Sequence, residues 1–318
     1  MRYSRNEVLK EIREKGQETL RNKTVVIVGV GAIGTVSSEL LARMGVNLIL
    51  IDKDEIEESN LGRQTLFTWK DVGKSKVKVA KEKLLEINNE IRIRTIDKTL
   101  SKDNLDILKG DLILDCTDNM ATRFLINEYC VKNKIPWIHA AAIKTKGVLF
   151  NVIPGKACFS CVYPKGKDIE SCEDVGVLNT VTSNIASLQV TEAVKILLNK
   201  KIENKLMRLD LWKNTFDKIE VKRNSNCKVC DGNGINNDFS IKLCKTKASY
   251  SVKPIKNLKL DLSKIKKKFN VTIETPILLV IKEDNEEIII HDFGEIVFKT
   301  LKDEDKIRDI AMRIYKER

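Results

Sequence analysis

The sequence has no apolar run long enough to cross a membrane. Its longest such runs, near residues 25–33 and 276–281, fall far short of the roughly 20 apolar residues that a transmembrane helix needs. The first 15 residues are charged throughout, so the chain does not open with a basic-then-apolar export signal. We therefore expect a cytoplasmic protein with no membrane partner.

Other absences narrow the range of functions. No G-x-x-x-x-G-K-[ST] run occurs in the 318 residues, which excludes a P-loop ATPase. The two histidines form no Ser/His/Asp set, and no internal repeat is present. The net charge of +12 favours acidic partners, but it is spread along the chain rather than gathered in a basic arm, so binding of nucleic acid is not favoured.

Short apolar strands alternate with helical patterns over the first 141 residues. Because right-handed crossovers make the strands of such units parallel, this order predicts an α/β, doubly wound, Rossmann-like and mostly parallel sheet. The expected strands are 24–29, 46–52, 91–96, 111–116 and 136–141. An amphipathic helix is expected over 4–20. Strands near 146–153, 206–211 and 216–222 predict an antiparallel extension of the sheet.

A turn-rich stretch over residues 231–238 is the predicted linker between two domains. The expected boundaries are 1–234 for the larger domain and 235–318 for a small α+β domain of unknown role. Within the small domain, the pattern predicts strands at 248–253, 277–282 and 287–298, and helices at 262–269 and 304–316.

Gly29, Gly31 and Gly34 form a G-x-G-x-x-G fingerprint that follows a strand and opens a helix. Glycines there let the backbone approach phosphate oxygens, and the helix N-terminus supplies unpaired N–H groups. Asp52 ends the next strand, where a carboxylate can accept hydrogen bonds from ribose hydroxyls. Taken alone, the fingerprint favours NAD, and a tight turn without a ligand is the alternative.

The next segment argues against a simple dehydrogenase. Asn60, Arg63 and Gln64 come just after the ribose-binding strand, and Lys76 opens the following helix. Hydride transfer needs no cations beside the phosphates, whereas nucleotidyl transfer needs them to offset the charge that grows on the leaving group. These residues therefore favour a nucleotide triphosphate.

A pair of acids closes the strand at 111–116, in the run Asp115-Cys-Thr-Asp118-Asn119. An acid at this edge that faces a triphosphate is a natural ligand for Mg²⁺. The alternative role for Asp118 is to cap the helix that follows, and the two roles are compatible.

Two C-x-x-C pairs, Cys158/Cys161 and Cys227/Cys230, together form a tetrahedral ligand set for structural Zn²⁺. The 65 intervening residues exceed the usual gap of a zinc ribbon, and a redox C-x-x-C would need only one pair. Cys172 stands in a polar loop as the best candidate nucleophile, although its neighbours Glu173 and Asp174 disfavour the thiolate.

These motifs, in this order, resemble the E1-like activating enzymes, specifically the molybdopterin and thiamine sulfur-carrier adenylyltransferases of the MoeB/ThiF/HesA group. The resemblance covers residues 1 to about 232. It rests on Arg2–Arg5, Gly16-Gln17, Gly29–Gly34, Asn60–Gln64, Lys76, Asp115–Asn119, both cysteine pairs and Ser187–Lys195.

The resemblance implies an enzyme that uses Mg²⁺ and ATP to adenylylate the C-terminal glycine of a small ubiquitin-fold protein ending in Gly-Gly, releasing pyrophosphate. It implies that Asp52 holds the ribose and that Asp118 positions the Mg²⁺. It also implies that Asn60, Arg63 and Lys76 surround the phosphates. In a homodimer, Arg5 would reach the partner subunit's triphosphate; a surface charge is the alternative.

The sequence departs from the family pattern in one place, where Asn179-Thr180 follow Gly176-Val-Leu instead of Gly-Pro. The resemblance therefore leaves open whether Cys172 forms a thioester or acyl disulfide. Two other functions are weighed against the activating enzyme: a cyclising dehydratase of tRNA threonylcarbamoyladenosine type, and a Rossmann module that only binds NAD.

Overall fold

The computed structural model describes residues 2–163, 176–233, 241–245, 250–254, 259–283, 286–301, 303–315 and 317. The chain divides into two compact units, Met1–Ile235 and Asn236–Arg318. No helix in these described ranges is both long and apolar enough to cross a membrane.

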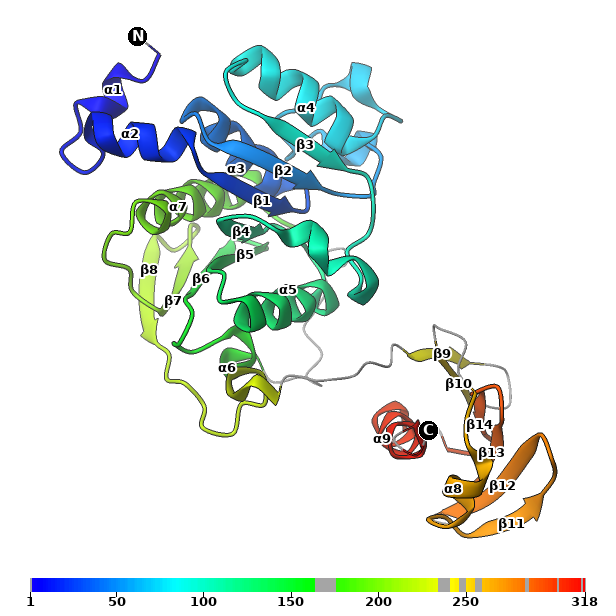
Figure 1. The fold of residues 1–318 in the computed structure, drawn as a ribbon. Coiled ribbons are helices and arrows are strands. Elements are labelled where there is room, and N and C mark those ends of the chain that lie inside the picture. Colours follow the sequence, from blue (N-terminus) through cyan, green and yellow to red (C-terminus); the bar gives the residue numbers. More distant parts are fainter. Residues whose placement is uncertain are drawn as a thin grey trace. The chain divides into compact units, whose positions relative to one another are not determined.

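The first unit is built on one eight-stranded sheet with the order β3-β2-β1-β4-β5-β6-β7-β8 (Figure 1). Its first five strands in this order are parallel, and β6, β7 and β8 add to β5 in antiparallel fashion. The predicted mostly parallel α/β sheet with an antiparallel extension is therefore confirmed. The strands are β1 (Thr24–Val28), β2 (Asn47–Ile51), β3 (Ile93–Ile96), β4 (Leu112–Asp115), β5 (Trp137–Ile143), β6 (Lys146–Val152), β7 (Lys205–Asp210) and β8 (Thr215–Glu220).

Side chains that alternate along the parallel strands enter two separate cores. In β1, Val25 and Ile27 pack into the core beneath α3 and α7, while Val26 and Val28 pack on the opposite face, beneath α5. Figure 1 shows α3 and α7 on one side of the sheet and α5 on the other. Apolar residues at every position are what a sheet covered on both faces requires. The helices of this unit are α1 (Ser4–Glu7), α2 (Arg13–Arg21), α3 (Ala32–Arg43), α4 (Lys76–Ile87), α5 (Met120–Asn133), α6 (Phe159–Val162) and α7 (Asn179–Leu197).

The prediction of a single amphipathic helix over residues 4–20 is wrong. The structure has two short helices, α1 and α2, and Arg13 at the start of the second has a left-handed φ of 57°. Val8 is 80% exposed, so the apolar residues of this segment do not share one buried stripe. Without that stripe the packing that stabilises a continuous helix is missing.

The second unit is a small α+β fold. Its six strands form an antiparallel sheet in the order β11-β12-β13-β14-β10-β9, and both α8 and α9 contribute to the core on one of its faces. The expected long strand over 287–298 is two strands, since the chain turns at Gly294, where φ is 93°. The elements are β9 (Ile241–Lys245), β10 (Tyr250–Pro254), α8 (Leu262–Lys266), β11 (Val271–Glu274), β12 (Leu278–Glu283), β13 (Glu286–His291), β14 (Ile296–Phe298) and α9 (Glu304–Tyr315).

Candidate active site

The strand order places a crevice between β1 and β4. From β1 the chain runs outward through β2 and β3, then returns to the other side of β1 to form β4 and β5. Connections leave β1 and β4 toward opposite sides, so the ends of these two strands are not covered by a crossover. Ligands of open α/β sheets bind at such a switch point, outside the carboxyl ends of the strands.

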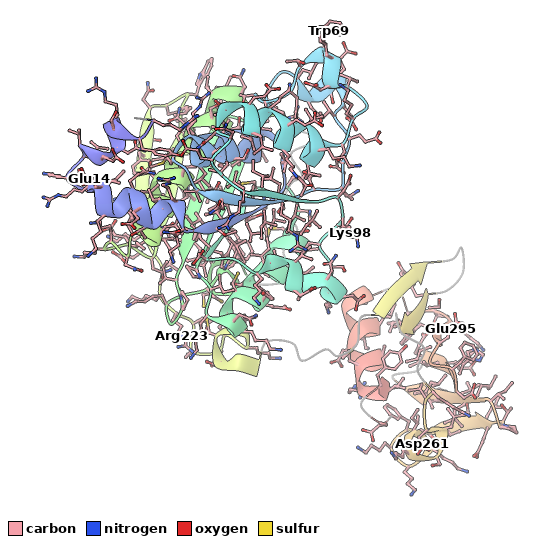
Figure 2. All side chains as sticks on the ribbon, turned by 45° about the horizontal axis from the view of Figure 1, so that its top comes forward. Glu14, Trp69, Lys98, Arg223, Asp261 and Glu295 are labelled. Atoms are coloured by element: carbon pink, nitrogen blue, oxygen red, sulfur yellow. The ribbon has the colours of Figure 1, made fainter. Side chains whose placement is uncertain are left out.

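A cavity of about 560 Å³ opens at this point. It brings together the sequence-predicted nucleotide residues except Gly34, which does not line it, and adds several residues after β3 and β4. One of the added residues is Lys98, which Figure 2 labels. The residues that line the cavity include Gly29, Gly31, Asp52, Asn60, Arg63, Gln64, Lys76, Lys98, Leu100, Asp118, Asn119 and Arg123.

The glycines of the fingerprint differ in what surrounds them. A Cβ on Gly34 would lie 2.0 Å from the carbonyl oxygen of Gly29, so this glycine lets α3 pack against the turn. Gly29 has a φ of 90° and lies against Cys116, whose carbonyl oxygen a Cβ would approach to 2.7 Å. Gly31, by contrast, faces open space, because a Cβ there would have only Gln64 Nε2 within 4 Å among the described residues. The backbone at Gly31 is therefore the part a ligand phosphate can approach.

Asp52 is anchored beside this turn. Its Oδ2 accepts a hydrogen bond from the Val30 N–H at 2.6 Å, and its Oδ1 accepts one from the Asp54 N–H at 2.9 Å. Burial raises the pKa of Asp52, although these hydrogen bonds and the charge of Lys76 oppose the rise. Each carboxylate oxygen still has a second lone pair for a hydroxyl of a bound ribose.

Lys76 and Gln64 are two buried polar side chains of the cavity, and the described protein leaves one Gln64 atom without a partner. Lys76 is 7% exposed, and its Nζ lies 3.4 Å from a single carboxylate oxygen, that of Asp54. The Gln64 side chain is 4% exposed, and its Oε1 has no hydrogen-bond partner among the described residues. A buried polar atom without a partner is costly, and a buried ammonium with one long contact keeps donors for a ligand, so both residues fit a site that a polar ligand completes.

Asn60 and Arg63 are held by their own turn. The Asn60 amide bridges Ser59 and the Glu57 N–H in a capping box around the short helix Glu58–Asn60. Arg63 donates from its guanidinium to the Ser59 carbonyl oxygen at 2.9 Å and is half-buried on the cavity wall. The other guanidinium donors lie free of any described hydrogen bond and suit a phosphate.

The two acids of the β4 end have different environments. Asn119, not Asp118, caps α5: its Oδ1 accepts from the Thr122 N–H at 2.8 Å. The alternative role of Asp118 as the helix cap is therefore wrong. Its side chain is exposed in the cavity, with no hydrogen bond or ion pair to any described residue. An unengaged carboxylate at this place fits a divalent cation.

Asp115 is fully buried beneath the same edge and is paired with residues that sequence reasoning missed. His139 Nδ1 lies 2.7 Å from its Oδ2, and Arg123 Nε lies 3.4 Å from the same oxygen. Burial by itself raises the pKa of Asp115, but the bond from His139 and the charge of Arg123 outweigh it and lower the pKa. Burial lowers the pKa of His139. We conclude that Asp115 is ionised and His139 neutral, with the proton on Nδ1.

Arg5 lies away from this cavity. Its neighbours along the chain are tied to the amino edge of the sheet: Tyr3 Oη accepts from Asn88 Nδ2 at 2.9 Å, and Asn6 Nδ2 donates to Gln17 Oε1 at 3.2 Å. Arg5 itself is exposed. It belongs to α1, which Figure 1 labels near the N-terminus. The pocket of the same chain opens at the opposite, carboxyl edge. Cys172 lies outside the described residues.

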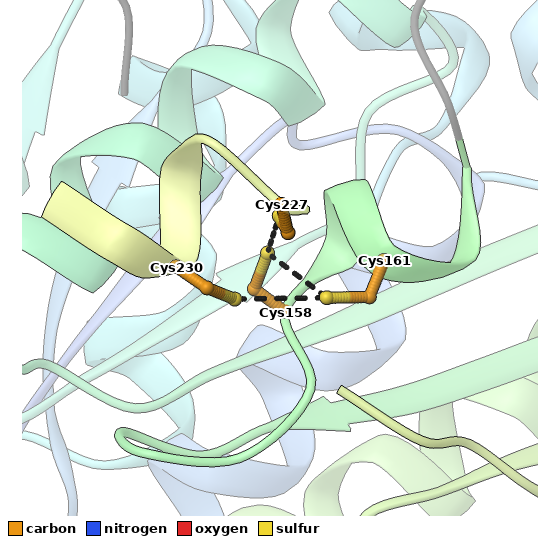
Figure 3. A group of neighbouring side chains, drawn as sticks. All are labelled: Cys158, Cys161, Cys227 and Cys230. Atoms are coloured by element: carbon orange, nitrogen blue, oxygen red, sulfur yellow. Dashed lines mark hydrogen bonds between the residues drawn. The ribbon is translucent and has the colours of Figure 1, made fainter. Parts of the chain in front are cut away.

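Four cysteine thiols converge on the α5 side of the sheet (Figure 3). The sulfurs of Cys158, Cys161, Cys227 and Cys230 all lie within 4.8 Å of one another. Neighbouring pairs are 3.9, 3.6 and 3.6 Å apart. Zn–S bonds of about 2.3 Å in a tetrahedron require sulfurs about 3.8 Å apart, so this donor set fits Zn²⁺.

The sequence profile of the ThiF family matches residues 3–229, which is most of the first unit. This chain belongs to the ThiF family. The match to the ThiF family ends before the second unit begins.

Two curated proteins and one crystal structure show what this chain is similar to. The chain is 31% identical over 242 residues to the SAMP-activating enzyme E1 of Haloferax volcanii, covering 74% of this chain and 90% of the relative. It is 36% identical over 239 residues to the sulfur carrier protein ThiS adenylyltransferase of Escherichia coli, covering 73% and 95%. A crystal structure of E. coli MccB with ATP superposes with a TM-score of 0.61 at 28% identity, covering 67% of this chain and 68% of that one.

Proposed function

We propose that this protein is an adenylyltransferase that uses ATP to activate the C-terminal glycine of a small ubiquitin-fold or sulfur-carrier protein. The observation that carries the proposal is the buried Lys76 ammonium, which lines the carboxyl-edge cavity together with Arg63 and the unengaged Asp118. These charged side chains would have no role in a hydride-transfer enzyme or in a protein that only binds NAD. The SAMP-activating enzyme and the ThiS adenylyltransferase, to which the chain is similar, support the same reaction.

The chemistry follows from where charge develops. A carboxylate oxygen of the carrier attacks the α-phosphorus of ATP; a new O–P bond forms, the bond to the β-phosphate oxygen breaks, and pyrophosphate leaves with the electron pair. Lys76 and Arg63 offset the negative charge that grows on the departing pyrophosphate. Asp52 orients the ribose. Holding the reactants together removes much of the entropic part of the barrier.

Asp118 is the residue that would hold Mg²⁺, because its carboxylate is exposed in the cavity and has no described partner. A bound Mg²⁺ supplies charge neutralisation of the phosphates. Asn119 is engaged in capping α5 through its side-chain oxygen, so we assign it to placing the turn rather than to binding the ion. The four-cysteine cluster is proposed to hold a structural Zn²⁺.

Exchange of labelled pyrophosphate into ATP tests the proposal. We expect exchange that depends on Mg²⁺ and on a small carrier protein ending in Gly-Gly, and that disappears when the carrier lacks its final glycine. A carrier truncated in this way is the matched control, since its fold is unchanged. Absence of exchange with every Gly-Gly carrier of the same genome would contradict the proposal.

We further propose that the enzyme works as a homodimer in which Arg5 enters the partner subunit's pocket. Support comes from the position of Arg5, which the amino-edge contacts of Tyr3 and Asn6 hold away from the cavity of its own chain. Arg5→Ala and Lys76→Ala should each be inactive alone, yet regain exchange when mixed, because a mixed dimer contains one pocket with both residues intact. Failure of the mixture to regain exchange would refute this arrangement.

A covalent step on Cys172 stays a prediction. Its thiolate would attack the acyl carbon of the adenylate, forming a C–S bond and releasing AMP. Cys172→Ala should then abolish transfer to an acceptor and spare pyrophosphate exchange, whereas loss of both would exclude the covalent route.

A further inference from the structure

Gln189 is a fully buried polar residue on α7 that the proposed reaction does not use. It belongs to the run Ser187–Lys195, one of the motifs that carry the family resemblance, for which no role has yet been assigned. Its exposed fraction is 0%, and its hydrogen bonds go to α3, to the carboxyl end of β4 and to the second residue of β5. A buried amide of this kind is tolerated only when its hydrogen bonds are made.

All of the groups of this amide have partners. Nε2 donates to the carbonyl oxygens of Asp115 at 3.0 Å and of Ile138 at 3.2 Å, which belong to the adjacent strands β4 and β5. Oε1 accepts from Ser37 Oγ at 2.9 Å and from Cys116 Sγ at 3.4 Å. Two donors and two acceptor positions are therefore used, so the side chain has one orientation.

The bonds lie where the sheet opens. The β4 ladder ends at Asp115, which pairs with Val28 on one side and His139 on the other. Beyond that point the strands separate to form the crevice. Gln189 donates a hydrogen bond to each of the Asp115 and Ile138 carbonyl oxygens there. Removing one partner of a buried hydrogen bond leaves the other group unsatisfied and therefore destabilises this arrangement.

Cys116 connects this amide to the phosphate-binding turn. A Cβ on Gly29 would lie 2.7 Å from the Cys116 carbonyl oxygen, and one on Gly34 would lie 3.4 Å from the Cys116 Cβ. Cys116 thus lies in contact with two glycines of the turn and with Gln189. Asp118 follows two residues later in the chain. A contact that fixes the position of Cys116 therefore also fixes the distance between the glycine-rich turn and Asp118.

We propose that Gln189 is a positioning residue that sets the separation between the glycine-rich turn and Asp118. It touches neither ATP nor the carrier. It acts by holding the end of β4 and Cys116 against the turn. A cation held by Asp118 would then be placed to contact a phosphate bound at Gly31. The inference rests on the proposed function, because it concerns the metal ligand of that same site.

The same helix provides a matched control. Glu192 lies three residues further along α7, is 7% exposed, and accepts a hydrogen bond from Asn151 Nδ2 at 2.6 Å. Asn151 belongs to β6, and neither residue lines the cavity. Replacing Gln189 or Glu192 by methionine removes a buried polar group of similar size in each case.

The experiment compares Gln189→Met with Glu192→Met by calorimetric titration of ATP with and without Mg²⁺, together with pyrophosphate exchange. For Gln189→Met we expect an unchanged affinity for metal-free ATP and a loss of the gain in affinity that Mg²⁺ gives. We also expect a roughly tenfold higher Mg²⁺ requirement for exchange and a kcat lower by about 10- to 100-fold, the size of effect that a misplacement near 1 Å produces. Glu192→Met should lower stability only.

A folded Gln189→Met protein with the wild-type Mg²⁺ dependence would overturn the inference, as would an equal shift in Glu192→Met. If Gln189→Met does not fold, Ser37→Ala decides: it removes one bond to Oε1 and should raise the Mg²⁺ requirement by about two- to threefold. An unchanged requirement in Ser37→Ala would then overturn it. Wild-type protein without exchange would instead refute the proposed function, while its ATP titrations would still report on Gln189.

Discussion

Two places in the described part of the first unit, both proposed here to hold metal ions, differ in how completely the protein surrounds them. At the cysteine cluster, four sulfurs face one another within 4.8 Å, and Cys158 and Cys227 are buried. At the carboxyl edge, the Asp118 carboxylate stands exposed in a cavity of about 560 Å³ and has no hydrogen bond or ion pair to a described residue. Structural metal sites are closed by protein ligands, whereas catalytic sites keep positions for the substrate. This difference supports our proposal that the first site holds a structural metal ion and that the second holds the metal ion of the reaction.

The largest effect that we predict comes from removing one ligand of the cysteine cluster. Cys158→Ser should release the metal and lower the free energy of unfolding of the first unit by about 4 kcal/mol, by analogy with cross-links that close loops of comparable length. The measurement is denaturant unfolding together with metal analysis. Cys130→Ala is the control, a buried thiol outside the cluster. Metal loss without loss of stability would contradict a structural role.

The second prediction concerns the open site. Lys76→Ala should lower pyrophosphate exchange by roughly 10²- to 10³-fold, because it removes a preorganised charge from the leaving group. Stability should change little, since the mutation relieves a buried cation that has one long contact, to Asp54 at 3.4 Å. Lys78→Ala is the control on the same helix; Lys78 is 71% exposed and pairs with Asp97. Equal losses in the two variants would show that Lys76 has no special task.

The smallest effect we predict is on pH dependence. Burial lowers the pKa of His139 in the folded protein. As the pH falls below about 6.5, the unfolded chain binds a proton that folded His139 resists, so stability is lost in that direction. His139→Gln should flatten the unfolding free energy between pH 6.5 and 5, by no more than about 1.4 kcal/mol per pH unit.

Chemical denaturation of the first unit at several pH values measures this effect. His291→Gln, in the second unit, is the control and should leave the pH profile of the first unit unchanged. A His139→Gln profile that is as steep as that of the wild type would show that His139 is not held neutral by burial.

Much of the first unit could be predicted because its signals are local. The fingerprint Gly29–Gly34 lies between a strand and a helix in the sequence itself, and the strand ends that carry Asp52 and Asp118 follow from short apolar runs. The sheet edge then gathers them, since parallel strands end on one side. Both cysteine pairs were also visible, although only the fold shows that a gap of 65 residues closes.

What the sequence could not reveal depends on contacts between distant residues. Gln189 bonds to residues 152 and 74 positions away in the chain, and no periodic pattern reports such pairs. The contact between His139 and Asp115, which are 24 positions apart, was not predicted from the sequence. Arg123 had a usable signal: it follows the cap Asn119 by one turn, which puts it at the same edge. The break at Arg13 was missed because exposed Val8 looked like part of an apolar stripe.

A crystal structure with a nonhydrolysable ATP analogue and Mg²⁺ tests the central claim most directly. We predict that the triphosphate contacts Lys76 and Arg63, and that the metal ion is bound to Asp118. Phosphates that lie away from all three side chains, or a pocket that takes NAD and excludes ATP, would contradict the account.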